Sequence, residues 1–288
     1  MSAPSMIDMM TPAADLDADA LAASIRPDTA RRIERLDVFG SLDSTSRYLL
    51  ETRPPAHGRM HVAVADYQHA GRGRRGRSWT APPGGGLCLS VGISIRREPG
   101  DLLALPLAAG VAARRGISAA CGVAVALKWP NDVAWRDRKL GGILVERGSA
   151  GATLAHVVIG IGINVSIPRA MLPVLSDWPA GAVDLAEATE GRPPPRVALA
   201  GALVDELAAL SVAFERDGFA PYRDEFAAAD ALLGRTVLVD GEGAATSGIA
   251  RGVDEHGALI VELPDGSRRR VLAGDVSIRA ARRVEVRE

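Results

Sequence analysis

Hydrophobic residues follow two different periods along the chain, and the shorter period predicts strands. Runs with strand character lie at 60–68 (MHVAVADYQ), 87–95 (LCLSVGISI), 123–127 (VAVAL), 141–146 (GGILVE) and 156–165 (HVVIGIGINV). Several of these runs are apolar at consecutive positions, which is typical of strands covered on both faces. We therefore expect a sheet with helices packed on at least one side.

Helical patterns separate these runs. A helix is predicted after the capping residues Ser44 and Thr45, and another ends at Gly218, a residue type that often terminates helices. The helical segments are 46–53 (SRYLLETR), 101–122 (DLLALPLAAGVAARRGISAACG) and 196–218 (RVALAGALVDELAALSVAFERDG). Strands and helices mixed in this order predict an α/β or α+β domain of catalytic size.

The two ends of the chain differ from its middle. Residues 1–35 are rich in Ala, Asp, Pro and Ser, so we expect a poorly ordered extension with a helical turn or two. After Leu233, short β runs separated by the turn sequences DEHG and PDGS predict a small barrel. The predicted domains are the extension (1–35), a catalytic domain (36–231) and the C-terminal barrel (232–288).

Composition narrows the classes of function. The 34 Lys and Arg and 35 Asp and Glu residues give a formal net charge of -1, so no overall field attracts nucleic acid or membranes. Cys88 and Cys121 lack the spacing of a zinc or redox site, and both are expected to be small core residues. The N-terminus is acidic, and no apolar run approaches the length of a membrane span. We expect a cytoplasmic protein in which any anion site is local.

The stretch GRGRRGR at 71–77 is the first candidate for such a site. Glycine allows the backbone to approach a ligand closely, and arginine presents planar donors that match phosphate or carboxylate oxygens. Repulsion between the arginines and the entropy of the glycines predict a mobile loop without ligand. By itself the stretch fits an anion site, a solvated basic turn or a nucleic-acid patch.

Three further stretches are ambiguous when taken singly. KWPNDV at 128–133 follows an apolar strand and fits either a polar binding turn or an ordinary β-turn. Lys139 precedes two glycines that open a strand, where it fits a ligand contact or a solvated strand end. GIGIN at 160–164 fits close packing of a strand equally well.

Five motifs taken together favour one interpretation. They are LDSTS (42–46), DYQHAGRGRRGRSW (66–79), LKWPNDV (127–133), RKLGGILVE (138–146) and GIGINV (160–165). Their order and spacing resemble those of bacterial biotin protein ligases, over roughly residues 36–285. The resemblance implies an α+β fold with a mixed β-sheet flanked by helices, as in class II synthetase-like ligases, and a C-terminal SH3-like β-barrel.

The resemblance also implies a reaction. Enzymes of this family join the carboxylate of biotin to the α-phosphate of ATP and release pyrophosphate. They then transfer biotin to a lysine of the biotin carboxyl carrier protein of acetyl-CoA carboxylase or related carboxylases. The small molecules implied are biotin, ATP and Mg²⁺, a hard cation that takes oxygen ligands. We expect a carrier domain as protein partner and a monomer or weak homodimer.

The family motifs assign roles to residues of this chain. Arg74 is expected to grip the adenylate phosphate and Lys139 to contact the biotin carboxyl oxygen, so both are the predicted catalytic residues. The residues expected to bind biotin are Ser44, Thr45, Gln68, Gly71, Arg72, Arg74, Lys139 and Gly142, with Leu89, Gly141 and Ile143 as walls. The residues expected to bind ATP are Arg74, Arg75, Trp79, Lys128, Asn131, Asp132, Asn164 and Trp178. Stacking on adenine and simple loop packing remain alternatives for Trp178.

Two features depart from the family pattern. Ser46 follows the DST sequence where relatives often have asparagine, so it is left outside the predicted site. Only 43 residues precede Ser44, too few for a winged helix-turn-helix, and we expect a monofunctional ligase that does not bind DNA. Two alternatives are a lipoate or octanoate protein ligase and a non-enzymatic protein that binds nucleic acid through its arginines.

Overall fold

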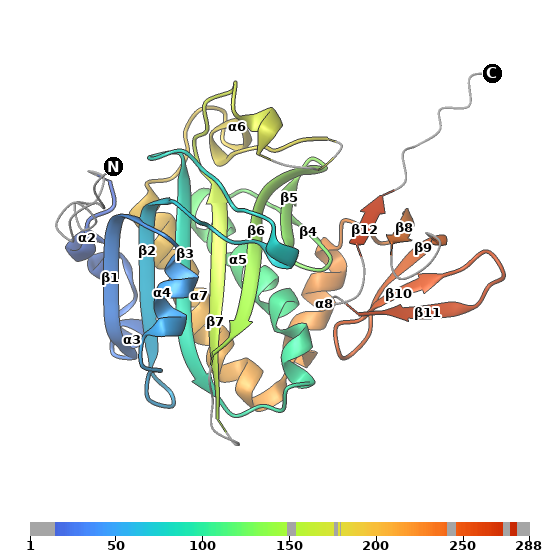
Figure 1. Cartoon of the computed structure of the whole chain (residues 1–288), viewed down its shortest axis with the longest axis horizontal. Helices are drawn as coiled ribbons and strands as arrows, with labels where there is room; N and C mark the ends of the chain where they lie inside the picture. Colours follow the sequence, from blue (N-terminus) through green and yellow to red (C-terminus); the bar gives the residue numbers. More distant parts are fainter. Residues whose placement is uncertain are drawn as a thin grey trace.

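Two β-sheets organise the molecule (Figure 1). The structure, a computed structural model, describes residues 15–148, 154–175, 178, 180–240, 246–272 and 277–280. The larger sheet has seven strands in the order β1-β2-β3-β7-β6-β5-β4. These are β1 (Ile33–Leu42), β2 (Met60–Gln68), β3 (Gly86–Ile95), β4 (Ala126–Lys128), β5 (Asp132–Trp135), β6 (Arg138–Arg147) and β7 (Ala155–Asn164). Because β1 and β2 are parallel while the other neighbours are antiparallel, the sheet is mixed.

Helices cover the two faces of this sheet unequally. One face carries α5 (Leu105–Cys121) and α7 (Arg196–Asp217), which pack on each other, and the opposite face carries α4 (Thr45–Glu51) (Figure 1). The shorter helices are α2 (Ala18–Ser24), α3 (Pro27–Ala30), α6 (Leu185–Ala188) and α8 (Ala220–Ala229), and the 3-10 turns are η1 (Arg74–Gly76), η2 (Asp101–Ala104) and η3 (Leu172–Val174). The predicted α+β class with a mixed, helix-flanked sheet is confirmed.

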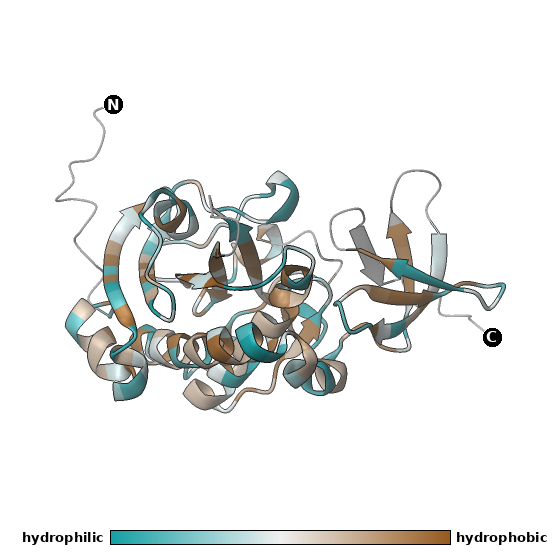
Figure 2. Cartoon of the chain, turned by 90° about the horizontal axis from the view of Figure 1, so that it is seen from below, coloured by the Kyte–Doolittle hydropathy of each residue, from teal (hydrophilic) through white to brown (hydrophobic). Residues whose placement is uncertain are grey.

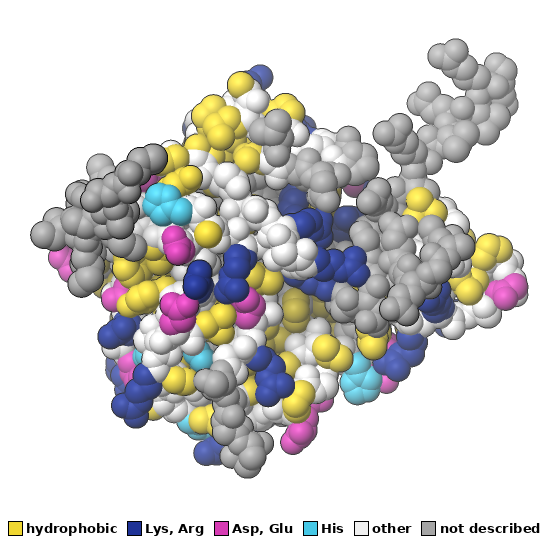
Figure 3. Space-filling view, in the orientation of Figure 1, with side chains coloured by type: hydrophobic (Ala, Val, Ile, Leu, Met, Phe, Trp, Pro, Cys, Tyr) yellow, Lys and Arg dark blue, Asp and Glu magenta, His cyan; other side chains and the backbone are white. Residues whose placement is uncertain are grey.

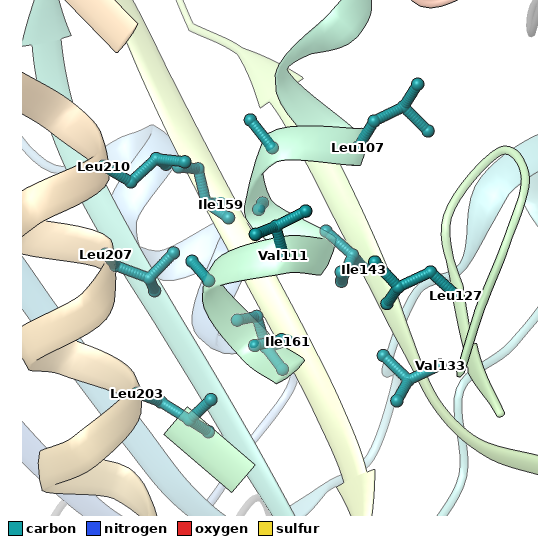
Figure 4. Close-up of a cluster of buried hydrophobic side chains, with 14 of the residues drawn as sticks. Leu107, Val111, Leu127, Val133, Ile143, Ile159, Ile161, Leu203, Leu207 and Leu210 are labelled. Carbon is teal, nitrogen blue, oxygen red and sulfur yellow. The ribbon is translucent and has the colours of Figure 1, made fainter. Parts of the chain in front are cut away.

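The core lies between the sheet and the pair α5 and α7. Large aliphatic side chains from these helices meet those of β6 and β7, as the close-up in Figure 4 shows for Val111, Leu207, Ile143 and Ile161. On β3 and β7, such residues alternate with small or polar ones, because successive side chains of a strand point to opposite faces. The α4 side of these strands is therefore left with little bulk.

The two long helices are also long and apolar enough to cross a membrane by length and composition. They correspond to Asp101–Cys121, with 21 residues, and Arg196–Asp217, with 22 residues. The expectation that no apolar run approaches this length was therefore wrong. Most of each helix is buried in the protein core, which accounts for its apolar composition.

The C-terminal unit is a five-stranded antiparallel sheet beside the large one (Figures 1 and 2). Its strands, in the order β11-β10-β9-β8-β12, are β8 (Thr236–Asp240), β9 (Thr246–Val253), β10 (Leu259–Glu262), β11 (Arg268–Val271) and β12 (Ser277–Ala280). The buried Trp129 links the two units, since its indole Nε1 donates a 3.0 Å hydrogen bond to the carbonyl oxygen of Gly257. This small β unit is the one that the sequence pattern predicts.

Residues 15–35 differ from the poorly ordered extension that composition predicts; residues 1–14 lie outside the described residues. Asp17 caps α2, and Leu16 and Leu21 are fully buried. Asp15 forms an ion pair with Arg196, which is itself 2% exposed and also pairs with Asp66 at the end of β2. Two buried leucines and a buried guanidinium thus hold this segment on the catalytic fold. The pattern also missed β1 and α8.

Candidate active site

A cavity of about 300 Å³ opens on the α4 side of the large sheet. Its floor comes from β3, β6 and β7, where small residues leave room, and its rim comes from the start of α4 and the arginine loop at 71–77. Figure 3 shows Lys and Arg side chains gathered near the centre of this face of the molecule. The cavity has a neutral end and a charged end.

The neutral end is a set of hydroxyl and amide groups. Gln68 Oε1 accepts hydrogen bonds from the backbone N–H of Thr45, at 2.8 Å, and from its hydroxyl, at 3.1 Å. Ser90 Oγ lies 2.7 Å from Thr45 Oγ1 and 3.0 Å from Ser46 Oγ. Ser44 caps α4, since its hydroxyl accepts from the backbone N–H of Arg47. This end offers polar partners to a neutral head group.

The charged end is built on β5 and β6. Lys139 Nζ lies 2.7 Å from Asp132 Oδ1, and both side chains are mostly buried, at 17% and 10% exposure. Arg74 also lines the cavity, and its pKa is lowered mainly by burial and further by the charge of Arg75, while Asp132 opposes the shift. A carboxylate thus neutralises Lys139 in this state, and an anionic ligand would compete for the same ammonium group.

The arginine loop folds back on itself as a small hairpin. Gly73 N–H donates to the carbonyl of Arg77 at 2.7 Å, and Trp79 N–H donates to that of Gly71 at 2.9 Å. Arg72 forms an ion pair with Glu146 of β6 at 3.0 Å, and burial raises the pKa of Glu146 although Arg72 opposes this. These contacts stabilise the loop against the repulsion between its arginines, on which the expectation of a mobile loop was based.

Trp79 covers the middle of the cavity. A Cβ atom at Gly162 would lie 2.3 Å from its Cε2, so the indole rests directly on a strand that lacks a side chain there. The indole Nε1 is buried and has no hydrogen-bond partner within the described part of the chain. Neighbouring Cys88 is also buried, which raises the pKa of its thiol to about 12. The thiol is therefore uncharged at neutral pH.

The structure brings most predicted residues together. Those that line the cavity are Ser44, Thr45, Gln68, Arg72, Arg74, Trp79, Asn131, Asp132, Lys139 and Gly142, together with the predicted walls Leu89 and Ile143. Asn131 also has a structural contact, because its Nδ2 donates to the carbonyl of Ile143 at 2.6 Å. The grouping agrees with the sequence prediction, while the individual roles remain predictions.

Other predicted residues lie outside this cavity. Gly71 and Arg75 line a second hollow on the outer side of the arginine loop, and Arg75 has a left-handed backbone with φ 57°. Lys128 Nζ lies 4.1 Å from the ring centroid of Trp178, so these two residues contact each other. Asn164 is buried and donates to the carbonyl of Val183 at 3.0 Å. In this structure Asn164 supports the segment beside Lys139.

Sequence reasoning missed part of the cavity wall. Residues that line it without having been predicted are Ser46, Gly73, Arg77, Ser78, Cys88, Ser90, Leu144, Gly160, Ile161, Gly162 and Leu175. A pattern for some of them exists: on β3 and β7, small residues at every second position alternate with large aliphatic ones. Such alternation indicates a strand with one packed face and one face left open.

The donor set also limits how a metal ion can bind. No cluster of three or more His, Cys, Asp or Glu side chains that could hold an ion occurs among the described residues. Asp132 is the one carboxylate that these residues contribute to the cavity wall. Mg²⁺ commonly binds through one or two carboxylates plus substrate phosphates, so this site fits an ion that is shared with a nucleotide.

Comparisons with known proteins agree on one family. The model described as "Biotin/lipoate A/B protein ligase family" matches residues 38–164, and "Biotin protein ligase C terminal domain" matches residues 232–279. The chain is 37% identical over 245 residues to the bifunctional ligase/repressor BirA of Escherichia coli, covering 85% of this chain and 74% of that protein. It is 36% identical over 242 residues to the biotin--[acetyl-CoA-carboxylase] ligase of Paracoccus denitrificans, covering 78% and 92%.

Solved structures give the same result. The biotin protein ligase from Aquifex aeolicus in complex with biotin and ATP is similar with a TM-score of 0.72 and 28% identity. The superposition covers 86% of this chain and all of that one.

Proposed function

This chain belongs to the biotin protein ligase family, and from that premise we propose how its cavity carries out ATP-dependent biotinylation. The enzyme activates biotin as biotinyl-5'-AMP and transfers it to a lysine of a biotin-accepting carboxylase protein. The alternative of a lipoate ligase is not favoured, because the similar proteins are biotin ligases.

The observation that carries the proposal is the separation of neutral and cationic groups along one cavity. Gln68 ends β2 and Lys139 begins β6, with β3 and β7 between them in the sheet. Three strand spacings correspond to about 14 Å. Biotin has a neutral ureido ring at one end and a carboxylate at the other. We therefore place the ring at Ser44, Thr45 and Gln68 and the carboxylate near Lys139.

In the first half-reaction, a biotin carboxylate oxygen attacks the α-phosphorus of ATP. The bond from that phosphorus to the oxygen bridging to the β-phosphate breaks, and pyrophosphate leaves. Lys139 and Arg74 both line the cavity, and we place the reacting carboxylate and α-phosphate beside them. Charges that are already in place lower the barrier without reorganisation. Bound Mg²⁺ would neutralise phosphate charge, with Asp132 as its protein ligand.

In the second half-reaction, the amine of the acceptor lysine attacks the acyl carbon of the adenylate. The bond between that carbon and the phosphate oxygen breaks, AMP leaves, and the nitrogen releases a proton to solvent. The mixed anhydride is strongly activated, so holding the amine close to the acyl carbon suffices and no protein base is assigned. Lys139 then stabilises the developing oxyanion, and Arg74 retains the departing phosphate.

The nucleotide is proposed to bind beyond Lys139, near Asn131, Asp132, Lys128 and Trp178. Lys128 Nζ lies over the Trp178 ring, and we propose that adenine stacks on this indole when the nucleotide binds. Arg75 and Asn164 fit nucleotide contacts less well, because Arg75 lies outside the cavity and Asn164 is buried in hydrogen bonds to the backbone.

The cellular setting is proposed on the same basis. The partner is a biotin carboxyl carrier domain, the location is the cytoplasm, and the chain acts as a monomer or weak homodimer. We also propose that it does not bind DNA. Salt-dependent binding to duplex DNA in a mobility-shift assay would contradict that last point.

The test is labelling of an apo carrier domain by the purified chain with biotin, ATP and Mg²⁺. We expect a mass increase of one biotinyl group, and no increase when the acceptor lysine of the carrier is replaced by arginine. Lipoate in place of biotin should give no labelling, and EDTA should stop the reaction if Mg²⁺ is required. Absence of labelling at saturating substrates would refute the proposed function.

A further inference from the structure

We propose that Ser90 is a positioning residue that holds the Thr45 hydroxyl on Gln68 Oε1, and so helps to keep Gln68 presenting its Nε2 donors to the ureido oxygen of biotin. This inference rests on the proposed function, because it concerns the end of the cavity that receives the biotin ring. Ser90 is fully buried on β3 and belongs to none of the five sequence motifs.

The orientation of Gln68 follows from which groups can only donate. The backbone N–H of Thr45 lies 2.8 Å from the Gln68 amide, and since an N–H only donates, the atom facing it is the oxygen Oε1. The Thr45 hydroxyl lies 3.1 Å from the same oxygen and must also donate to it. A carbonyl oxygen has two lone pairs, so both are used.

The same counting fixes the remaining hydroxyls. A hydroxyl has one hydrogen, so the Thr45 hydroxyl, which donates to Gln68, accepts from Ser90 at 2.7 Å. Ser90 has then used its hydrogen and accepts from Ser46 at 3.0 Å. The hydrogen bonds therefore run in one direction, from Ser46 through Ser90 and Thr45 to Gln68. By donating to Thr45 Oγ1, Ser90 satisfies the acceptor side of that hydroxyl and holds its hydrogen on Gln68.

The consequence appears at the cavity surface. With Oε1 occupied, Gln68, which lines the cavity, has only its Nε2 hydrogens to offer a ligand. Nε2 lies beside the arginine loop, since a Cβ atom at Gly71 would be 2.9 Å from it. The complementary ligand group is a hydrogen-bond acceptor. The oxygen of a cyclic urea is such an acceptor. A ligand with an N–H group in place of that oxygen would instead set a donor against the Nε2 donors of Gln68.

Gly160 makes the hydroxyl cluster possible. It lies opposite Ser90 in the register of β3 and β7, and a Cβ atom there would be 2.5 Å from Ser46 Oγ and 3.4 Å from Ser90 Oγ. A glycine at this position leaves space for Ser46 of α4 to contact Ser90 of β3 on this face of the sheet. The cluster is thus accommodated by the sheet itself and does not depend on the arginine loop.

The experiment compares Ser90→Ala with Ser94→Ala. Ser94 is a matched control, because it is a buried serine four residues further along β3, and its side chain points to the same face of the sheet. Its hydroxyl donates to the carbonyl of Pro55 at 2.6 Å. Binding of biotin and of 2-iminobiotin, in which the ureido oxygen is replaced by an imino group (=NH), is measured by calorimetry. Turnover with the carrier gives kcat and KM separately.

We expect Ser90→Ala to weaken biotin binding roughly ten-fold, the typical worth of a buried hydrogen bond, and to reduce the preference for biotin over 2-iminobiotin. The KM for ATP and kcat at saturating biotin should stay within two-fold of wild type. Ser94→Ala should change neither ligand preference nor biotin affinity. Ser90→Cys, which keeps a weak donor of similar size, should restore part of the preference.

Equal preference ratios for Ser90→Ala, Ser94→Ala and wild type would overturn the proposal, as would an equal loss in biotin affinity, ATP KM and kcat. If Ser90→Ala does not fold, Thr45→Val removes the bond between Ser90 and the Thr45 hydroxyl from its other side, and an unchanged preference ratio there overturns the proposal. The calorimetry needs no turnover. Failure of wild type to label the carrier would therefore refute the proposed function without deciding this inference.

Discussion

The polar groups at the neutral end of the cavity and those at its charged end are held in place in different ways. At the neutral end, Thr45, Gln68 and Ser90 satisfy one another through hydrogen bonds before any ligand arrives. At the charged end, Lys139 is satisfied by Asp132, a partner that an anionic substrate must displace or share. The neutral end is therefore preorganised for a ligand, whereas the cation at the charged end is paired with an internal counter-ion.

This difference separates recognition from catalysis. A preformed neutral template selects the head group at little cost in reorganisation, because its donors are already oriented. A paired ammonium group avoids the cost of an isolated buried charge until the reacting anions are present. Substitutions at the neutral end should therefore affect biotin affinity, whereas those at the charged end should affect the rate. Four predictions test this division, from the largest expected effect to the smallest.

Lys139→Ala should give the largest effect, a loss of roughly 10²- to 10³-fold in the rate of adenylate formation. The substitution removes a cation and leaves Asp132 facing the incoming carboxylate and phosphates. Single-turnover measurement of pyrophosphate release gives this rate. Arg138→Ala is the control, since Arg138 pairs with Glu187 and does not line the cavity. If the affinity for biotin fell as strongly as the rate, the assignment of recognition to the neutral end and catalysis to the charged end would be contradicted.

Arg74→Ala should follow, with about a 10²-fold loss or an adenylate that escapes into solution. Arg74 lines both the cavity and the outer hollow, whereas Arg75 beside it lines the hollow and not the cavity, so Arg75→Ala removes an equal charge from outside the cavity. We expect a much smaller loss for Arg75→Ala. Chromatography of free biotinyl-5'-AMP, with the rate of carrier labelling, distinguishes slow formation from leakage. Equal losses would mean that overall charge matters more than position.

Gly162→Ala should weaken biotin binding about ten-fold with a smaller effect on turnover. A Cβ atom there would lie 2.3 Å from the Trp79 ring, so the indole must move into the cavity, and such overpacking typically costs about 1–3 kcal/mol. Gly92→Ala is the control, because its nearest contact would be an ordinary 3.5 Å from His156. Calorimetry measures the affinity. Unchanged affinity with a slower rate would contradict the assignment of the cavity floor to recognition.

Glu146→Gln should give the smallest effect, at most about five-fold in biotin affinity, since it removes a partly exposed ion pair with Arg72. Burial raises the pKa of Glu146, so the folded state holds this proton more tightly than the unfolded chain. The stabilisation from that proton is present at low pH and is lost as pH rises through the folded pKa. The thermal stability of the variant should therefore rise relative to wild type from acidic to neutral pH.

A calorimetric or fluorescence melting series over that range checks this slope. Glu262→Gln, which breaks the exposed Arg251 pair in the C-terminal sheet, is the control. The pKa of Glu262 is lowered, mainly by its hydrogen bond from Arg251, so the control should show the opposite trend with pH. Parallel curves for the two variants would contradict a buried carboxylate at Glu146.

The sequence predicted the charged end more completely than the neutral one. Arg74, Asp132 and Lys139 lie within short motifs whose residue types already indicate anion chemistry. Ser44, Thr45 and Gln68 could be assigned through the same motifs. Ser90 could not, because one hydroxyl within an aliphatic strand resembles ordinary packing until a partner strand is known.

Tertiary pairing supplies what the sequence lacked. The importance of Ser90 depends on the register that places it opposite Gly160, and Asn164 proved to be a buried support because β6 and the segment around Val183 pass beside it. Strand register is set by contacts across the whole sheet and cannot be read from one strand. The order of residues 15–35 likewise depends on Arg196, more than 160 positions further along the chain.

The buried guanidinium of Arg196 has a practical consequence for where a shortened version of this protein can begin. A start at residue 36, which composition would suggest, removes the ion pair of Arg196 with Asp15 and leaves, among the described residues, its pair with Asp66. It also uncovers the surface that Leu16 and Leu21 occupied. Truncation or fusion designs should therefore retain Asp15 and everything after it.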